Sequence, residues 1–218
     1  MRSVLLLGLF ALACAVDPAR ALAPVPLPAP DGKPALRDPR PHSPRLANYR
    51  IHARLDAATR RIAATETLSF TNAGIASVDT LPLHLYMNAF KNESSVFARE
   101  AAGEFEDDAP KEAQWGWIEI SSIKDVKTST ELRARATYGA DETTLSVPLP
   151  APVAPGETIA LEIAFETQLP RIVARTGYEG DFLLVAQWFP KVGVLQVTGE
   201  RQAWHCESFH AHSEFFAD

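Results

Sequence analysis

The residues of this sequence that could do chemistry gather near its C-terminal end, in the stretch Asp181 to Asp218. They are His205, Cys206, Glu207, His210, His212 and Glu214. On a strand, His210 and His212 would point to the same face, and histidine, cysteine and carboxylate side chains are all zinc ligands. Their spacing matches no established set of zinc ligands. Ordinary histidines on or near a strand are therefore the favoured interpretation, a metal site is the alternative, and we predict no bound metal for this chain.

Motifs for catalysis are missing from the sequence. The zinc-peptidase motif H-E-x-x-H does not occur, and neither does the G-x-S-x-G motif of serine hydrolases. The glycines at 177, 180, 193 and 199 form no phosphate-binding loop. No catalytic residue is predicted.

Composition places the chain among globular proteins. It has 218 residues, of which 46% are hydrophobic and 22% charged, and a formal net charge of −6. A nucleic-acid-binding domain would need clustered lysine and arginine on a basic background, so nucleic acid is not an expected partner.

The first 21 residues have the pattern of a secretory signal. Arg2 precedes an apolar run from Val4 to Val16 that is too short to span a bilayer comfortably, and Ala19-Arg20-Ala21 fits a cleavage site. We expect export to the periplasm or the extracellular space, and no transmembrane segment beyond the signal. An uncleaved anchor is one alternative, and a lipid anchor on Cys14 is another, because Ala11-Leu12-Ala13-Cys14 loosely resembles a lipobox.

Residues 22–45 form a proline-rich linker in the sequence. Proline fixes φ and removes a backbone donor, so a disordered, extended spacer is expected there. After export Cys206 would be the only cysteine, and it could form no internal disulfide.

Apolar and polar residues alternate with a period of two through much of the remaining chain, residues 46–218. The pattern predicts strands over 49–55, 62–70, 78–86, 115–124, 132–138, 143–147 and 159–165. It also predicts a short helix at 95–102 and a proline-rich loop from Pro148 to Gly156. Many short strands without a strong helical period indicate an all-β domain, an antiparallel β-sandwich or curved sheet.

Several segments, taken in order, resemble one family. They are Tyr49-Arg50-Ile51-His52-Ala53-Arg54-Leu55-Asp56, Leu81-Pro82-Leu83-His84-Leu85-Tyr86, the stretch Leu149 to Phe165 with its Pro-Gly-Glu, Gln187-Trp188-Phe189-Pro190-Lys191-Val192-Gly193-Val194, Trp204, and Phe209 to Asp218. This order is similar to the N-terminal β domain of the gluzincin zinc metallopeptidases, the aminopeptidase N and leukotriene hydrolase superfamily. The C-terminal part is the most specific.

The resemblance implies a saddle-shaped β-sandwich that covers a downstream catalytic domain of the same polypeptide. In that family the zinc ligands lie on the catalytic domain, so zinc is implied for the full-length enzyme and not for this chain. Gln187 matches a position that helps form the peptide-binding wall, with a purely structural glutamine as the alternative. The family's Phe-Phe-x-Asp segment leads into another strand, so we expect this chain to be a fragment.

The expected function is therefore that of a non-catalytic N-terminal domain of an exported zinc metallopeptidase, of aminopeptidase type, that helps to shape a peptide-binding site. The alternative is a stand-alone secreted β-sandwich that binds a protein or a glycan.

Overall fold

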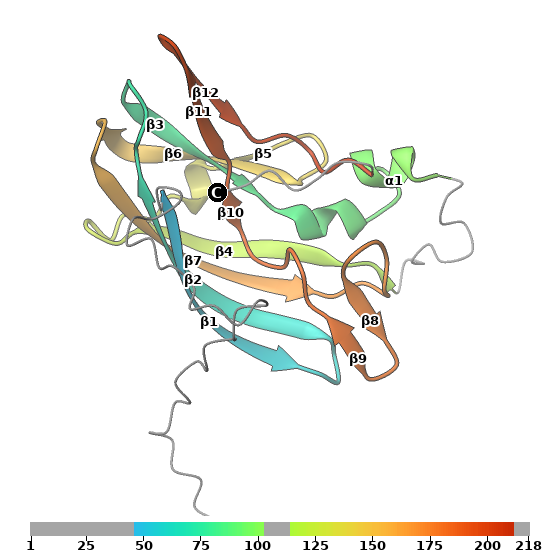
Figure 1. The fold of residues 1–218 in the computed structure, drawn as a ribbon. Coiled ribbons are helices and arrows are strands. Elements are labelled where there is room, and N and C mark those ends of the chain that lie inside the picture. Colours follow the sequence, from blue (N-terminus) through green and yellow to red (C-terminus); the bar gives the residue numbers. More distant parts are fainter. Residues whose placement is uncertain (1–45, 103–113, 212–218) are drawn as a thin grey trace, which may run out of the picture. The chain divides into compact units, whose positions relative to one another are not determined.

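The computed structural model describes residues 46–102 and 114–211 (Figure 1). All of them belong to one compact unit, residues 43–218. The predicted signal 1–21, Cys14 and the linker 22–45 lie outside the described residues, as do His212, Glu214 and the rest of the C-terminal end. Among the described residues, no helix has the length and apolar character needed to cross a membrane.

The first of two four-stranded sheets, sheet A, is antiparallel throughout. Its order is β1 (Ala47–Asp56), β2 (Arg61–Thr71), β7 (Thr158–Gln168) and β4 (Trp117–Asp125). The hairpin β1–β2 and the strand β7 were predicted within one to three residues at each end. Strands β2 and β7 each have one face that is buried along much of its length, and this produces the alternation in their sequences.

Sheet B faces sheet A and completes the sandwich (Figure 1). Its order is β10 (Lys191–Val192), β3 (Val78–His84), β6 (Thr144–Val153) and β5 (Thr137–Tyr138). Apolar side chains from both sheets belong to one buried cluster; the fully buried ones include Leu68, Phe70, Leu161, Ile163, Leu81, Leu83, Leu145 and Val147. The sheets are antiparallel and do not close into a barrel, so the predicted all-β fold class is confirmed.

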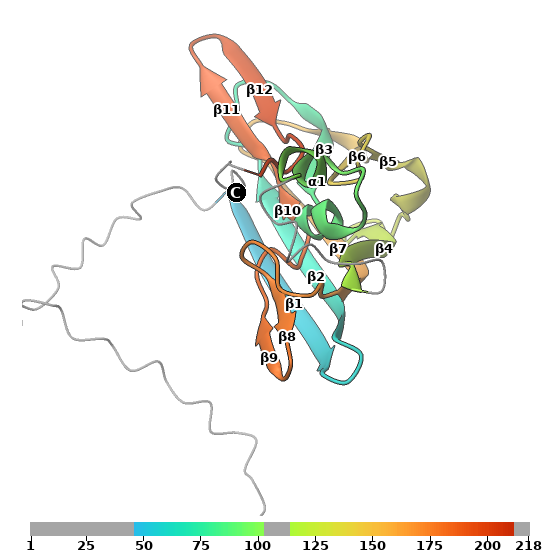
Figure 2. The ribbon, with the colours of Figure 1, turned by 90° about the vertical axis from the view of Figure 1, so that its right-hand side faces the viewer.

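Two small hairpins extend the sandwich at opposite ends (Figure 2). One consists of β8 (Gly177–Glu179) and β9 (Phe182–Leu184), and the other of β11 (Val194–Thr198) and β12 (Arg201–His205). The β8–β9 turn lies against the β1–β2 turn, because the Arg60 guanidinium donates to the Gly180 carbonyl (3.0 Å) and stacks on the Tyr178 ring.

Two predictions of local structure were wrong. Residues 132–138 form a 3-10 turn, η3 (Arg133–Arg135), followed by the two-residue β5, because the Glu131 carboxylate accepts from the Ile123 and Arg133 amides and bends the chain. The prolines at 148, 150 and 152 belong to β6 and not to a loop. Strand β5 pairs with only two residues of β6, Leu145 and Ser146. The three prolines lie beyond this pairing, so their missing N–H groups remove no hydrogen bond to β5.

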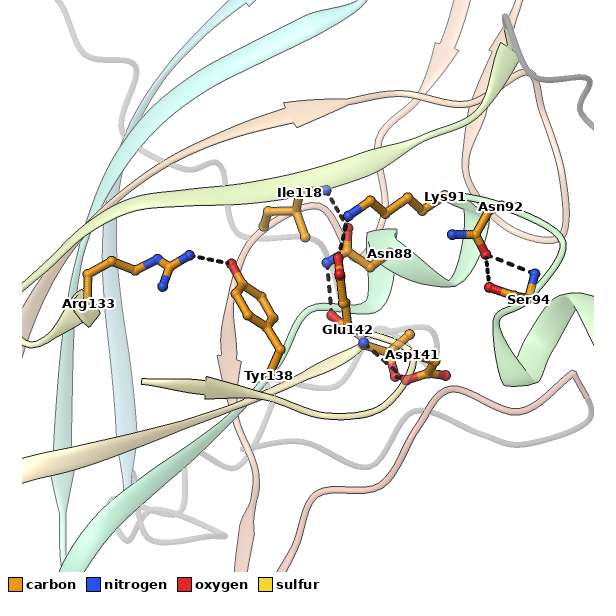
Figure 3. A network of polar contacts seen from close by, with 10 residues as sticks. Asn88, Lys91, Asn92, Ser94, Ile118, Arg133, Tyr138, Asp141 and Glu142 are labelled. Carbon is orange, nitrogen blue, oxygen red and sulfur yellow. Dashed lines mark hydrogen bonds and ion pairs between the residues drawn. The ribbon is translucent and has the colours of Figure 1, made fainter. Parts of the chain in front are cut away.

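A polar network ties the helical connection after β3 to the sandwich (Figure 3). The connection comprises η1 (Tyr86–Phe90) and α1 (Val96–Glu100), the latter lying within the predicted helix 95–102 and capped by the Ser95 hydroxyl. The buried Asn88 amide accepts from the Ile118 N–H (2.9 Å) and donates to the Glu142 carbonyl (2.8 Å). Lys91 and Glu142 form an ion pair beside it. Asn88 thereby fixes η1 to β4 and to the turn that precedes β6.

Candidate functional site

The candidate site is built by the crossing segment, residues 185–190, which leads from β9 on one side of the sandwich to β10 in sheet B (Figure 1). Gln187 in this segment has a left-handed backbone with φ of 54°. A non-glycine residue in this region is strained and needs support from its surroundings.

Hydroxyl groups of three side chains outside the crossing segment supply that support. The buried Thr176 hydroxyl lies 3.0–3.2 Å from the backbone O and N of Ala186, the residue before Gln187. The Thr167 hydroxyl donates to the Trp188 carbonyl (2.7 Å), the residue after it. The Tyr49 hydroxyl accepts from the Val192 N–H (3.0 Å) where the segment joins β10. The backbone on both sides of Gln187 is thus fixed by side chains from distant parts of the chain.

Gln187 lines a small hollow in the protein surface. The hollow is walled by the rings of Tyr86, Phe90 and Phe209, and its other lining residues are Ala174, Arg175, Thr176 and Ala211. Its volume is about 40 Å³, which is room for a water or two, or for one small functional group. Ala174, which shares the hollow with Gln187, also has a left-handed backbone, with φ of 49°.

Lys191 places a positive charge next to the Gln187 side chain. Its ammonium donates to the Gln187 side-chain oxygen and lies over the Phe189 ring, 5.1 Å from the ring centre. Burial lowers the Lys191 pKa. The amide oxygen keeps a second lone pair for a ligand donor, but Lys191 and Arg175 give this region a positive bias. Carbonyl and carboxylate oxygens of a ligand are the groups that this bias favours.

Two histidines of the alternative metal site, His205 and His210, contact carboxylates instead. His205 Nδ1 lies 3.8 Å from a carboxylate oxygen of Glu207. His210 Nδ1 lies 2.8 Å from the Glu100 carboxylate on α1, which also accepts from the Ala211 N–H. Residues 46–102 and 114–211 contain no group of three or more His, Cys, Asp or Glu side chains that could hold a metal. Within these ranges His205, Cys206, Glu207 and His210 do not come together as a zinc site, and His212 and Glu214 lie outside the described residues.

Cys206 is a partly buried thiol. Burial, with a smaller contribution from the neighbouring Glu207 charge, raises its pKa to about 12. Because the thiolate is the reactive and metal-binding form, Cys206 is a poor nucleophile and a poor ligand near neutral pH.

The sequence analysis singled out Gln187. It did not find the residues that wall the hollow, and it gave no role to Glu66. Tyr86, Thr176 and Phe209 come together only through the fold, and no local pattern marks them. Glu66 interrupted an otherwise apolar face of β2, which is a signal that the sequence did contain. The structure places its carboxyl in the core, fully buried.

Comparison with known proteins gives no identification: no family model matches the chain, and no curated protein matches it at a significant level.

Proposed function

We propose that this chain is a non-catalytic β domain of an exported zinc-dependent metallopeptidase of aminopeptidase type, and that Gln187 contacts the bound peptide. The observation that carries the proposal is the strained backbone of Gln187, which surrounding hydroxyls hold at an aromatic hollow. Strain of this kind is concentrated at functional sites. The same residue is the one that the family resemblance assigns to the peptide-binding wall, and an open antiparallel sandwich is the architecture that the resemblance implies.

An exposed apolar surface supports a role as a domain that docks on another. Leu55 at the end of β1 is 44% exposed, and Phe182 and Leu184 on β9 are 60% and 39% exposed. The two hairpins that carry them are joined by the Arg60–Gly180 hydrogen bond. Exposed apolar surface is typical of contact sites, and we propose that the downstream catalytic domain covers these three side chains.

The role of Gln187 is testable by NMR of the purified chain with trialanine as the peptide. We expect peptide-dependent shifts of the Gln187 and Thr176 signals in the wild type. Two variants separate side chain from backbone: Gln187→Gly relieves the left-handed strain, whereas Gln187→Ala keeps it. Both variants should lose the Thr176 shifts. Both also lose the hydrogen bond from Lys191, which contributes about 1 kcal/mol. Glycine regains about as much by relieving the strain, so only the alanine variant should be less stable than the wild type.

The exposed Gln196 on β11 provides the matched control. Gln196→Ala should bind trialanine as the wild type does. Unchanged Thr176 shifts in both Gln187 variants would show that the side chain takes no part in peptide binding.

A second hollow favours the alternative function of a binding module for a glycan. It has a volume of about 680 Å³ and is lined by Trp115, Trp117 and Tyr178 with Lys91 and Gln168 among its polar residues. Aromatic faces beside hydrogen-bonding side chains are a surface on which sugar rings can stack. Isothermal titration with oligosaccharides, repeated on Trp117→Ala, tests this function: no heat of binding, or equal binding by the variant, would reject it.

A further inference from the structure

Glu66 is the one acidic side chain on the buried face of β2. It is fully buried, and neither carboxyl oxygen has a hydrogen-bond partner. Its neighbours on that face, Ile62 and Leu68, are apolar. An ionised carboxylate without partners is very costly in such a place, and burial raises the Glu66 pKa to about 8. At neutral pH Glu66 is therefore mainly a neutral acid.

The crossing segment packs against the part of sheet A that contains Glu66. In sheet A, Glu66 pairs with Ile51 on β1 and Ile163 on β7. Tyr49 lies two residues from Ile51 and Phe165 two residues from Ile163, so these two rings flank Glu66 diagonally on the same face.

Two aromatic rings of the crossing segment bridge that diagonal. The Phe189 ring centre is 5.5 Å from that of Tyr49, and the Trp188 ring centre is 5.9 Å from that of Phe165. Trp188 and Phe189 also contact each other, at 5.5 Å. The pair therefore spans from β1 to β7 across β2, the strand that carries Glu66, and we call it the roof.

The titratable groups around this position are few. Two of them lie next to the crossing segment: the Tyr49 hydroxyl of β1 accepts from the Val192 N–H, and the Lys191 ammonium of β10 donates to Gln187. On β4, Asp125 is held by Lys127 N–H and the Thr128 hydroxyl. On β3, His84 stacks on Tyr86. None of these groups hydrogen-bonds to Glu66.

We propose that Glu66 is a pH-dependent switch beneath the crossing segment, and that its ionisation releases Trp188 and Phe189 from sheet A and moves Gln187 with them. Loss of the proton to solvent leaves a charge that must be hydrated. Water can reach it most easily through the roof, because the roof belongs to an irregular segment and the other neighbours belong to paired strands. The inference does not rest on the proposed function, although it would make the Gln187 hollow sensitive to alkaline pH.

The test follows Trp188 directly, by fluorine NMR of the full chain labelled with 5-fluorotryptophan, between pH 6 and pH 9.5. The variant Trp188→Phe assigns the Trp188 signal. We expect this signal to move to the position of a solvated tryptophan with a midpoint near pH 8, while the signal of Trp204 on β12 stays in place. In Glu66→Gln, which keeps the shape and cannot ionise, the Trp188 signal should not move.

A second measurement begins with the wild type. Acrylamide quenching of tryptophan fluorescence should increase at least about twofold from pH 6 to pH 9.5, and Trp188→Phe should lack most of this increase. A Trp188 signal and a quenching constant that are constant over this range, or that change equally in Glu66→Gln, would overturn the proposal.

Discussion

Replacing Glu66 by glutamine should change the stability of this protein in a strongly pH-dependent manner. The Glu66 pKa is about 8 in the folded chain, against an ordinary value of 4.5. A carboxyl whose pKa is raised on folding favours the folded state at low pH. That contribution is fully present below pH 4.5 and is lost as the pH rises through about 8.

The size of the effect follows from the two pKa values. Each pH unit between them corresponds to about 1.4 kcal/mol, so the wild type should lose ~3 kcal/mol of unfolding free energy by pH 7 and ~5 kcal/mol above pH 8. Release of the crossing segment would hydrate the ionised Glu66 carboxylate, so the wild type would lose less unfolding free energy above pH 8. Glutamine has no charge to gain, so Glu66→Gln should match the wild type near pH 4.5 and exceed its stability at pH 8.5.

Urea unfolding of the purified chain at pH 5, 6, 7 and 8.5, followed by circular dichroism, measures these differences. The carboxylates that the two proteins share affect both curves, so the difference between variant and wild type isolates Glu66. Glu119→Gln, on the exposed face of β4, is the matched control and should stay within about 0.5 kcal/mol of the wild type at every pH. A difference between Glu66→Gln and the wild type that does not grow with pH would refute the assignment of Glu66 as a neutral buried acid.

Three further outcomes test other parts of the structure. Phe209→Ala should lower the unfolding free energy by about 3–5 kcal/mol, because the buried Phe209 ring stacks on Phe97 and contacts Tyr86; urea unfolding measures it, and a loss below 1 kcal/mol would contradict this packing. Asn88→Ala should cost about 2–4 kcal/mol, since it leaves the Ile118 N–H and the Glu142 carbonyl without their partner, and an unchanged urea midpoint would exclude the role of Asn88. Cys206 should react with iodoacetamide at pH 8 at least about 100-fold more slowly in the folded chain than in the urea-unfolded chain, because its pKa is raised to about 12; equal rates by mass spectrometry would count against a shielded thiol.

The sandwich was predictable from the sequence where one face of a strand is buried and the other is exposed. Strand β7 illustrates this, because Leu161, Ile163 and Phe165 alternate with polar or small residues and all three are buried. Residues 132–138 show the limit of the same reasoning. They alternate equally well, but the hydrogen bonds of Glu131 turn the chain before a long strand can form. Period-two patterning reports which face a residue prefers, and it does not report side-chain bonds that compete with the sheet.

The candidate site was only partly predictable, because its parts become neighbours through tertiary packing. Gln187 was named from a resemblance, yet neither Thr176 nor Phe209 has a sequence feature that connects it to Gln187. The left-handed backbone at Gln187 was hidden for a different reason. Local propensity favours glycine or asparagine at such a position. It does not indicate when hydroxyl groups from other parts of the chain hold a different residue in this conformation.

The left-handed backbone at position 187 raises the question of why this residue is a glutamine. A glycine would take the same backbone without strain, so the conformation alone does not explain the residue. The glutamine side chain must therefore contribute something that glycine lacks, and the structure offers two candidates: the bond from Lys191 and the wall of the hollow. The Lys191 bond by itself is a weak reason, because a partly exposed hydrogen bond contributes only about 1 kcal/mol, which is close to the strain that the glutamine introduces. The balance favours a role for the side chain in binding, which is the role that the Gln187→Gly and Gln187→Ala pair is designed to measure.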